Sequence, residues 1–489
     1  MIRTLLIANR GEIARRIART AAEMGIESVA VYTEADANAP FVREAARAVP
    51  VRDYLDIEAV LDAARSAGAD AVHPGYGFLS ENPEFSSACR DRGIRFVGPP
   101  PEAMRALGNK SAARALAEKS GVPVVPGNSG ATDAAAAAAV GYPLLIKAAD
   151  GGGGKGMRLV ARKEEFAAAL ESARREAKAA FGSDAVLLEK LVRPARHIEV
   201  QFLADSGGAV VAVGERECSV QRRHQKIIEE CPSPMVDAAL RARLSEAAVK
   251  LARAAGYVNA GTCEFLVDAD RNFYFLEVNA RLQVEHPVTE MVYGVDLVRL
   301  QIKIAAGEAL PASAGSLVPR GHAIEARVCA EDPANGFLPA PGPILVYREP
   351  AGPGIRVDSG VEDGSEVSER YDPLIAKTIA CGEDRPAALA RLRRALREMV
   401  ILGTATNLDY VGDVLAHPAF AAGDLHTGFL DEHLAGWTPR APHDSAVFAV
   451  AAAAFEMRGS LGVPSDRRDG ASEWNPWRTL AEWGRGGRP

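Results

Sequence analysis

Short apolar segments alternate with longer amphipathic segments along residues 4–97. Residues 4–8 (TLLIA) and 28–32 (SVAVY) are apolar runs of strand length, and residues 13–24 between them carry apolar side chains at helical spacing. The alternation continues with helix-like segments at 57–66 and 83–92 and extended segments at 71–73 and 95–97. Strands that alternate with helices predict an α/β fold with a parallel, doubly wound sheet.

Two loops follow strands of this predicted sheet. Residues 9–12 (NRGE) come after the first strand, and residues 73–78 (HPGYGF) come at the end of a later one. Ligands of doubly wound sheets bind at the carboxyl ends of the strands, so both loops are candidates for a binding site. Ordinary turn chemistry explains them equally well.

A glycine-rich hairpin is predicted in the middle of the chain. Residues 142–146 and 158–161 predict its two strands, and the alanine-rich residues 131–140 before them predict a helix. The segments expected to complete this small α/β unit are a helix over 163–180 and strands over 186–190, 198–204 and 210–217.

The second half of the chain changes character twice. A long helix is predicted over residues 238–255, and a second hairpin follows around Asp270. From Arg320 the pattern is β-rich, with frequent Pro and Gly and one further helix over 385–399. The apolar residues 447–455 and the aperiodic residues 458–489 predict a linker or a poorly ordered tail.

Composition narrows the function classes. The 489 residues include 57 Lys and Arg against 64 Asp and Glu, a net charge of −7, which argues against a nucleic-acid partner. No apolar run approaches the ~18 residues of a membrane span, and residues 4–8 are too short for a secretory signal. The six cysteines form no CxxC pair, which predicts free thiols. We therefore expect a cytoplasmic protein with no membrane and no nucleic-acid partner.

The tip of the first hairpin has the composition of a phosphate-binding lid. Glycine occupies five of the six positions 151–156, within the sequence KAADGGGGKGM of residues 147–157. Such a run destabilises a strand or a helix, whereas its backbone N–H groups are able to wrap polyphosphate oxygens. Lys147 and Lys155 add positive charge on either side. A flexible hairpin tip is the alternative interpretation.

The second hairpin predicts a metal site. A turn at Asp270 and Arg271 pairs Glu264 with Glu277, and places Asn279 on the same face. Directly opposed residues have Cβ atoms ~4.5–5.5 Å apart, so one carboxyl must bind a proton or both need a cation. Two carboxylates and an amide oxygen suit Mg²⁺ or Mn²⁺. A solvated acidic sheet face is the alternative.

Two further segments each bring basic and acidic residues close together in the sequence. In residues 279–287 (NARLQVEHP), an extended backbone would present Arg281, Gln283 and Glu285 to one side, where arginine binds an oxyanion and glutamate acts as a general base. A surface salt bridge explains this segment equally well. Residues 221–226 (QRRHQK), followed by Glu229 and Glu230, either close a phosphate pocket or form a solvated face.

Taken together, these residues resemble the biotin carboxylases, a branch of the ATP-grasp superfamily. The matching stretches, in the order of that family, are ANRGEIA, HPGYGFLSEN, KAADGGGGKGM, RHIEVQ, QRRHQK, EVNARLQVEHPVTE and RVCAEDP. The resemblance implies an α/β ATP-grasp fold. It implies a Rossmann-like N-terminal domain at residues 1–113, an ATP-grasp domain at 114–318 with a lid at about 130–203, a β-rich C-terminal domain at 319–438, and a tail at 439–489.

The resemblance also implies roles for individual residues. The expected ATP contacts are Lys110, Lys147, Gly152, Gly153, Gly154, Lys155, Gly156, Met157, His197, Gln221 and His224, with Glu189 and Lys190 as the adenine hinge. The expected metal ligands are Glu264, Glu277 and Asn279. The expected bicarbonate and biotin site is Lys226, Arg281, Gln283, Val284, Glu285 and Arg327, with Lys226, Arg281, Glu285 and Arg327 as its catalytic residues. Asp150 departs from the family pattern, since a small residue commonly precedes the glycines.

The reaction that the resemblance implies is an ATP- and bicarbonate-dependent carboxylation of biotin N1, via carboxyphosphate. The implied cofactors are ATP, two Mg²⁺ or Mn²⁺ ions, and biotin supplied by a separate carrier domain. The implied partners are that biotin carboxyl carrier, a carboxyltransferase subunit and a second copy of the chain. Two alternatives are a carboxylate–amine ligase with another acceptor and a nucleotide-binding subunit without catalysis. The final carboxyl acceptor, such as acetyl-CoA, propionyl-CoA or pyruvate, stays open.

Overall fold

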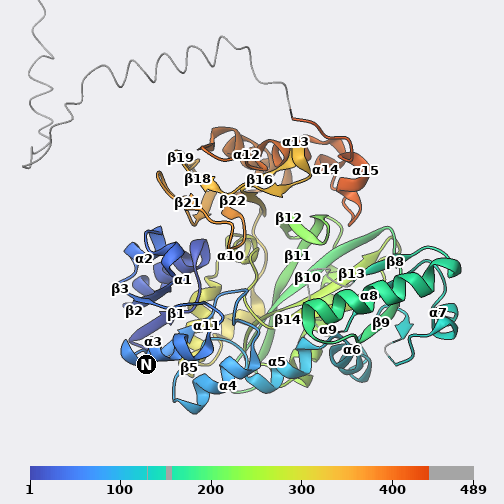
Figure 1. Ribbon diagram of the computed structural model, residues 1–489, viewed down its shortest axis with the longest axis horizontal. Coiled ribbons are helices and arrows are strands. Elements are labelled where there is room, and N and C mark those ends of the chain that lie inside the picture. Colours follow the sequence, from blue (N-terminus) through green and yellow to red (C-terminus); the bar gives the residue numbers. More distant parts are fainter. Residues whose placement is uncertain (129, 150–156, 440–489) are drawn as a thin grey trace, which may run out of the picture. The chain divides into compact units, whose positions relative to one another are not determined.

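A computed structural model describes residues 1–128, 130–149 and 157–439 (Figure 1). Its N-terminal part is a five-stranded parallel sheet in the order β3-β2-β1-β4-β5. The strands are β1 (Thr4–Ile7), β2 (Glu27–Tyr32), β3 (Arg47–Pro50), β4 (Ala71–His73) and β5 (Arg95–Phe96). The helices are α1 (Gly11–Glu23), α2 (Pro40–Glu44), α3 (Ile57–Ser66), α4 (Pro83–Asp91) and α5 (Pro101–Gly108). The predicted parallel sheet is confirmed; β3, which is mostly exposed, and the short helix α2 were not predicted.

A small four-stranded sheet forms the α/β unit around the first hairpin, where the lid was predicted, and is called the lid unit here. Its order is β6-β9-β7-β8, and β7 pairs with β8 in an antiparallel hairpin, as predicted. The elements are β6 (Gly127–Asn128), α7 (Ala134–Val140), β7 (Leu144–Ala148), β8 (Arg158–Val160), α8 (Phe166–Phe181) and β9 (Val186–Lys190). Helix α6 (Lys110–Lys119), which precedes them in the chain, packs against α5 instead. Leu144, Ile146 and Val160 are buried against the helices. The glycine tip, residues 150–156, lies outside the described residues.

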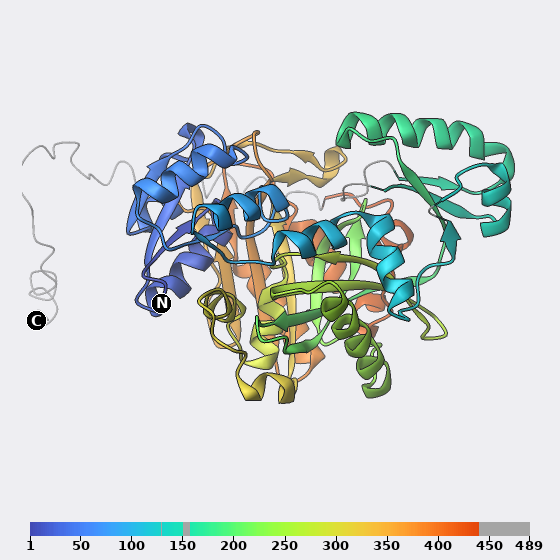
Figure 2. The ribbon, with the colours of Figure 1, turned by 90° about the horizontal axis from the view of Figure 1, so that it is seen from below.

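The largest sheet has eight strands in the order β14-β13-β10-β11-β12-β15-β22-β20. Figure 2 shows its green, yellow and orange strands side by side. The strands are β10 (Ala195–Ala204), β11 (Val210–Arg222), β12 (Gln225–Cys231), β13 (Asn259–Asp268), β14 (Phe273–Asn279), β15 (His322–Cys329), β20 (Ile355–Ser359) and β22 (Leu374–Gly382). The prediction that residues 198–204 and 210–217 complete the lid unit is therefore wrong. Both segments pair with strands of the large sheet because β10 lies between β13 and β11.

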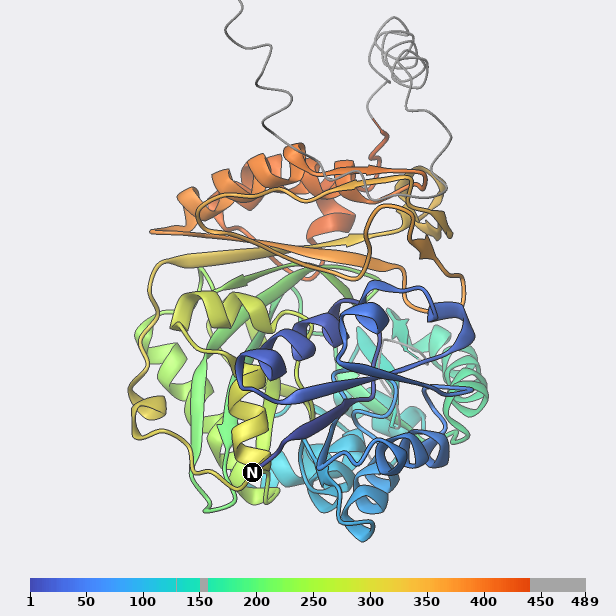
Figure 3. The same ribbon diagram turned by 90° about the vertical axis from the view of Figure 1, so that its left-hand side faces the viewer.

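Three helices from the middle of the chain pack against the large sheet. They are α9 (Ala238–Ala254), α10 (His286–Tyr293) and α11 (Leu297–Ala305). The blue helix α1 lies next to the yellow helices in Figure 3. Arg16 of α1 joins them through hydrogen bonds of 2.8 Å to both Glu290 and Asp296. The N-terminal part is thereby held against the large sheet by buried ion pairs.

The C-terminal part adds short strands and helices around β15 and β22. The short strands are β16 (Glu331–Asp332), β17 (Leu338–Pro339), β18 (Gly342–Pro343), β19 (Val346–Arg348), β21 (Glu366–Val367) and β23 (Val400–Leu402). The helices are α12 (Arg385–Glu398), α13 (Leu408–Ala416), α14 (Pro418–Ala422) and α15 (Phe429–His433). The β-rich character and α12 were predicted, whereas α13, α14 and α15 were not. The apolar segment 447–455 and the tail after it lie outside the described residues.

The predicted pairing of the second hairpin is confirmed at the end that carries the acids. Glu264 pairs with Glu277, and Thr262 pairs with Asn279. Nearer the turn the register shifts by one residue, so that Phe265 faces Phe275. A β-bulge at Leu276 accounts for the shift, because an extra residue on one strand moves all later pairs. The single turn position assumed from the sequence therefore does not describe the whole hairpin.

The cysteines are free thiols, as the sequence predicts. Six free cysteines are present, four of them buried, while Cys329 and Cys381 are half-buried. Within the described part of the chain, no helix has both the length and the apolar character needed to cross a bilayer.

The buried face of the second hairpin generates a stability prediction. The ring of Phe265 is fully buried and meets Phe273 edge-on at 5.5 Å between centroids. We expect Phe265→Ala to lower the free energy of unfolding in urea by about 3–5 kcal/mol, because it leaves a cavity between these rings. Leu338→Ala, at a side chain that is 64% exposed, is the control and should change it by less than about 0.5 kcal/mol. A loss below about 1 kcal/mol for Phe265→Ala would contradict the packing.

Candidate active site

A cavity of about 1430 Å³ is lined by residues of the lid sheet and the large sheet and by the loops that follow β1 and β4. It brings together almost every predicted site residue that the structure describes. These lining residues are Lys110, Lys147, Met157, Glu189, Lys190, His197, Gln221, His224, Lys226, Glu264, Glu277, Asn279, Arg281, Gln283, Val284 and Arg327. Glu285 is buried directly behind the wall. Gly152, Gly153, Gly154, Lys155 and Gly156, with Asp150, lie outside the described residues.

The two loops at the carboxyl ends of β1 and β4 form one wall. The Asn9 amide donates hydrogen bonds of 2.7 Å to the carbonyl oxygens of Pro74 and Tyr76. The Tyr76 hydroxyl in turn donates to Glu12. These contacts join the loops that the sequence placed at a binding edge, and both loops line the cavity.

Glu264 is the most heavily bonded carboxylate of the second hairpin. Its Oε1 accepts from Lys226 Nζ at 2.8 Å, Asn279 Nδ2 at 2.8 Å and Gln283 Nε2 at 3.1 Å. Its Oε2 lies 2.8 Å from His197 Nε2. Burial alone would raise the pKa of Glu264, but Lys226 and His197 outweigh it and lower that pKa. Glu264 is therefore a carboxylate held by protein cations.

Glu277, opposite Glu264, faces the cavity. Its side chain is 30% exposed, and an oxygen lies 3.3 Å from Lys110 Nζ. Together with Glu264 and the Asn279 amide it supplies oxygen donors to one face of the hairpin, which is the donor set that hard divalent cations prefer. The predicted metal residues thus fit Mg²⁺ chemically. The sequence argument did not predict that Glu264 would also pair with Lys226 and Glu277 with Lys110.

Two lysines predicted to bind phosphate are paired with acids. Lys110, at the start of α6, faces Glu277, and Lys147 on β7 pairs with Glu189 on the neighbouring strand β9. The neighbouring Lys190 instead donates a hydrogen bond of 2.8 Å to the Tyr142 carbonyl oxygen. The side chains of the predicted adenine hinge are therefore engaged within the lid.

The segment after the hairpin is not extended. The His286 N–H donates to the Gln283 carbonyl at 3.3 Å, which closes a turn, so the prediction of an extended segment is wrong. Arg281 and Gln283 still share the cavity and are joined by a hydrogen bond of 2.8 Å. Glu285 turns inward because it ends this turn and immediately precedes α10. The three residues therefore do not face the cavity together: Arg281 and Gln283 line it, whereas Glu285 is buried.

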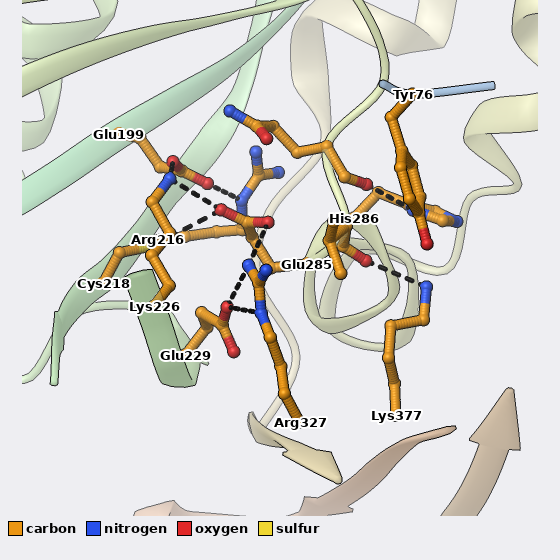
Figure 4. Close-up of polar contacts among 12 residues, drawn as sticks. Tyr76, Glu199, Arg216, Cys218, Lys226, Glu229, Glu285, His286, Arg327 and Lys377 are labelled. Carbon is orange, nitrogen blue, oxygen red and sulfur yellow. Dashed lines mark hydrogen bonds and ion pairs between the residues drawn. The ribbon is translucent and has the colours of Figure 1, made fainter. Parts of the chain in front are cut away.

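Glu285 lies between two cations (Figure 4). Lys226 Nζ is 2.7 Å from its Oε1, and Arg327 Nη2 is 2.9 Å from its Oε2. Burial would raise the pKa of Glu285, but Lys226, Arg327 and Arg216 overcome this and lower it far below its usual range. The side chain is an ionised carboxylate, and its basicity depends on how closely these cations remain.

Several residues of this cluster were missed by the sequence argument. Glu199 accepts from Lys226 at 2.5 Å and from the fully buried Arg216 at 2.5 Å. Glu229 accepts from Arg327 Nε at 2.6 Å, and Glu81 accepts from Arg281 Nε at 3.0 Å. The signal for Glu199 was present, because His197 and Glu199 alternate along one strand in RHIEVQ.

Comparison with known families gives consecutive matches along the chain. "Biotin carboxylase, N-terminal domain" matches residues 1–104, "Carbamoyl-phosphate synthase L chain, ATP binding domain" matches residues 109–313, and "Biotin carboxylase C-terminal domain" matches residues 325–432. Together the three matches account for most of the described chain.

Individual relatives agree with these family matches. The mitochondrial methylcrotonoyl-CoA carboxylase subunit alpha of Rattus norvegicus is 50% identical over 444 residues, which cover 88% of this chain but only 62% of the rat protein. The biotin carboxylase of Nostoc sp. is 48% identical over 439 residues, covering 88% of this chain and 98% of that protein. A solved dimer of the biotin carboxylase domain of Hydrogenobacter thermophilus 2-oxoglutarate carboxylase, with MgADP, ADP and bicarbonate, has a TM-score of 0.87 at 42% identity, covering 88% of this chain and 98% of that one.

The buried Arg216 generates a prediction about the site's electrostatics. Arg216 is 0% exposed and also contacts Gln201 at 2.9 Å and Thr262 at 3.1 Å. We expect Arg216→Met to lower the free energy of unfolding by about 3–5 kcal/mol, because Glu199 loses a buried partner. Arg65→Met, at a side chain that is 76% exposed and paired with Asp62, is the control and should cost less than about 1 kcal/mol. Equal losses of stability in the two variants would refute the role of Arg216 as the buried partner of Glu199.

Proposed function

The chain belongs to the biotin carboxylase family, and we propose that its cavity uses ATP and bicarbonate to carboxylate N1 of biotin through carboxyphosphate. This is the first half-reaction of a biotin-dependent carboxylase. The observation that carries the proposal is Glu285, an ionised buried carboxylate held between Lys226 and Arg327 at the cavity wall. A base next to cations is what the deprotonation and activation of a small oxyanion require.

The ATP end of the cavity is assigned to the lysines and the hairpin acids. Lys110 and Lys147 would leave their carboxylate partners for the phosphates of ATP, because phosphate oxygens carry more charge than a single carboxylate. His197, Gln221, His224, Met157 and the glycines 152–154 and 156, with Lys155, would complete the nucleotide contacts, and Glu189 and Lys190 the adenine hinge. Mg²⁺ or Mn²⁺, two ions in our proposal, would be held by Glu264, Glu277 and Asn279 and would neutralise charge on the transferred phosphoryl group.

The bicarbonate end is assigned to the turn and its cations. Arg281, Lys226, Gln283 and Val284 would hold bicarbonate while Glu285 accepts its proton. An anion that draws Lys226 toward itself weakens the hold of this cation on Glu285, so the basicity of Glu285 rises when the substrate is bound. Bicarbonate would then attack the γ-phosphate and release ADP.

Biotin would be carboxylated in the second step. Carboxyphosphate breaks down to CO₂ and phosphate, and the phosphate takes the N1 proton of biotin. Arg327 would leave Glu285 to stabilise the negative charge on the ureido oxygen, and the biotin nitrogen would then attack CO₂.

The proposal extends to organisation and partners. We propose domains at residues 1–113, 114–318 and 319–438, a lid within the second, and a tail at 439–489. Biotin would arrive on a separate carrier domain and pass its carboxyl group to a carboxyltransferase subunit, and the chain would pair with a second copy, as the biotin carboxylase domain of Hydrogenobacter thermophilus 2-oxoglutarate carboxylase does. A cytoplasmic location stays a prediction, since the rat relative is named as mitochondrial.

Biotin-stimulated ADP release tests the reaction. We expect the full chain, with Mg²⁺ and ATP, to release ADP only when bicarbonate is present, and faster when free biotin is added. Folded protein that shows no stimulation by biotin, or that is stimulated by an amine in place of biotin, would contradict the proposal. The second result would identify a carboxylate–amine ligase.

Glu285→Gln tests the assigned base. We expect bicarbonate-dependent ADP release to fall by about 10²- to 10⁴-fold, because an amide does not accept the proton of bicarbonate. The affinity for ATP, measured by nucleotide titration, should stay close to that of the parent. Glu246→Gln, at an exposed glutamate of α9 that pairs with Lys250, is the control and should keep full activity. Unchanged turnover in Glu285→Gln would remove the base from the mechanism.

A further inference from the structure

The turn that presents Glu285 is held at two of its three peptide groups by buried side chains. The turn spans residues 283–286, and its own hydrogen bond runs from the His286 N–H to the Gln283 carbonyl at 3.3 Å. His286 Nδ1 donates to the same carbonyl at 2.7 Å, so this ring nitrogen carries the hydrogen. A β-turn's own hydrogen bond leaves the central peptide, here between Val284 and Glu285, without a partner.

Lys377 supplies that partner. Its Nζ donates to the Val284 carbonyl oxygen at 2.9 Å, and the side chain is 0% exposed (Figure 4). Lys377 lies on β22 directly opposite Arg327 on β15. Two cations on adjacent strands therefore hold consecutive residues of the turn, Arg327 at the Glu285 carboxylate and Lys377 at the backbone just before it.

The remaining contacts of Lys377 come from two other regions. Glu12 Oε1 lies 3.2 Å from its Nζ and Asp358 Oδ2 lies 3.9 Å from it, while the Tyr76 ring centroid is 5.9 Å away. Glu12 and Tyr76 belong to the N-terminal loops that line the cavity. Lys377 thus joins these loops, the C-terminal strand and the turn at one point.

The position of the turn follows from these bonds. The C=O and N–H of a trans peptide point in opposite directions, so fixing a carbonyl also fixes the N–H of the same peptide. Lys377 therefore sets the direction of the Glu285 N–H, and His286 sets that of the Val284 N–H. Val284, Gln283 and Arg327 line the same cavity, so the orientation of this turn shapes the wall that an anion meets.

We propose that Lys377 is a positioning residue for the anion-binding turn, acting through the Val284 carbonyl and touching no substrate itself. The proposal rests on the assignment of bicarbonate to this turn. The proposal predicts that loss of Lys377 affects one substrate more than the other. Loss of Lys377 disturbs the binding and deprotonation of bicarbonate and leaves ATP binding, which involves the lid and the second hairpin, largely intact.

The test compares Lys377→Met with the double variant Lys377→Met/Glu12→Gln. Methionine keeps much of the side-chain volume and removes the donor, while the second change removes the acid that would lose its counter-ion. We expect both variants to raise the KM for bicarbonate by about tenfold or more, as for the loss of a charged hydrogen bond. The KM for ATP should stay within about twofold, and the double variant should recover stability relative to the single variant. Lys303→Met, a change at an exposed lysine of α11, is the control.

Every outcome decides the question. A KM for bicarbonate within twofold of the parent in a folded variant overturns the proposal, and so do equal rises in the KM for bicarbonate and for ATP. Failure of both variants to fold also overturns it, because Lys377 would then be a general structural residue. Bicarbonate-dependent ADP release by the parent is measured first. Its absence refutes the proposed function, whereas its presence with unchanged variants refutes only the positioning role.

Discussion

Lys226 places one ammonium group among three buried carboxylates, those of Glu199, Glu264 and Glu285, at 2.5–2.8 Å from each. Three like charges in an interior of low dielectric are unstable without cations, since each carboxylate is both desolvated and repelled by the others. Arg216, His197 and Arg327 add the further donors that this arrangement requires. The strands of the large sheet converge on this cluster, and the rest of the site is arranged around it.

This charge network couples the two ends of the cavity. Glu264 belongs to the predicted metal site and Glu285 to the proposed bicarbonate site, yet both bond to the same lysine. A cation or anion that binds at one end of the cavity therefore changes how strongly Lys226 interacts with the carboxylate at the other end. Lys226 thus links Glu285 electrostatically to the other end of the cavity.

Local sequence patterns predicted the parts of the site that lie within one hairpin or one loop. Alternation along residues 262–281 was sufficient to pair Glu264 with Glu277, because that pairing depends only on the turn between them. The alternation did not predict the β-bulge at Leu276, because the pattern of apolar and polar side chains does not indicate an inserted residue. Glu199 and Arg216 escaped because their contact depends on β10 lying beside β11 in the large sheet, and the sequence had suggested that both strands belonged to the lid. The turn before α10 was predicted to be extended, and the lysine that holds its central peptide, Lys377, is a neighbour only in the fold.

The order of the large sheet explains why Glu285 is held so firmly. Strand β12, which carries Lys226, pairs with β15, which carries Arg327, and β15 pairs with β22, which carries Lys377. Three consecutive strands therefore direct one cation each toward the same short turn. Neighbouring strands are ~4.7–4.9 Å apart and move little relative to each other, so the spacing of the three cations is set by backbone hydrogen bonds rather than by side-chain flexibility. The sheet runs without a break from the ATP-grasp strands into the C-terminal strands, and this continuity fixes the strand positions from which Lys226, Arg327 and Lys377 reach the turn.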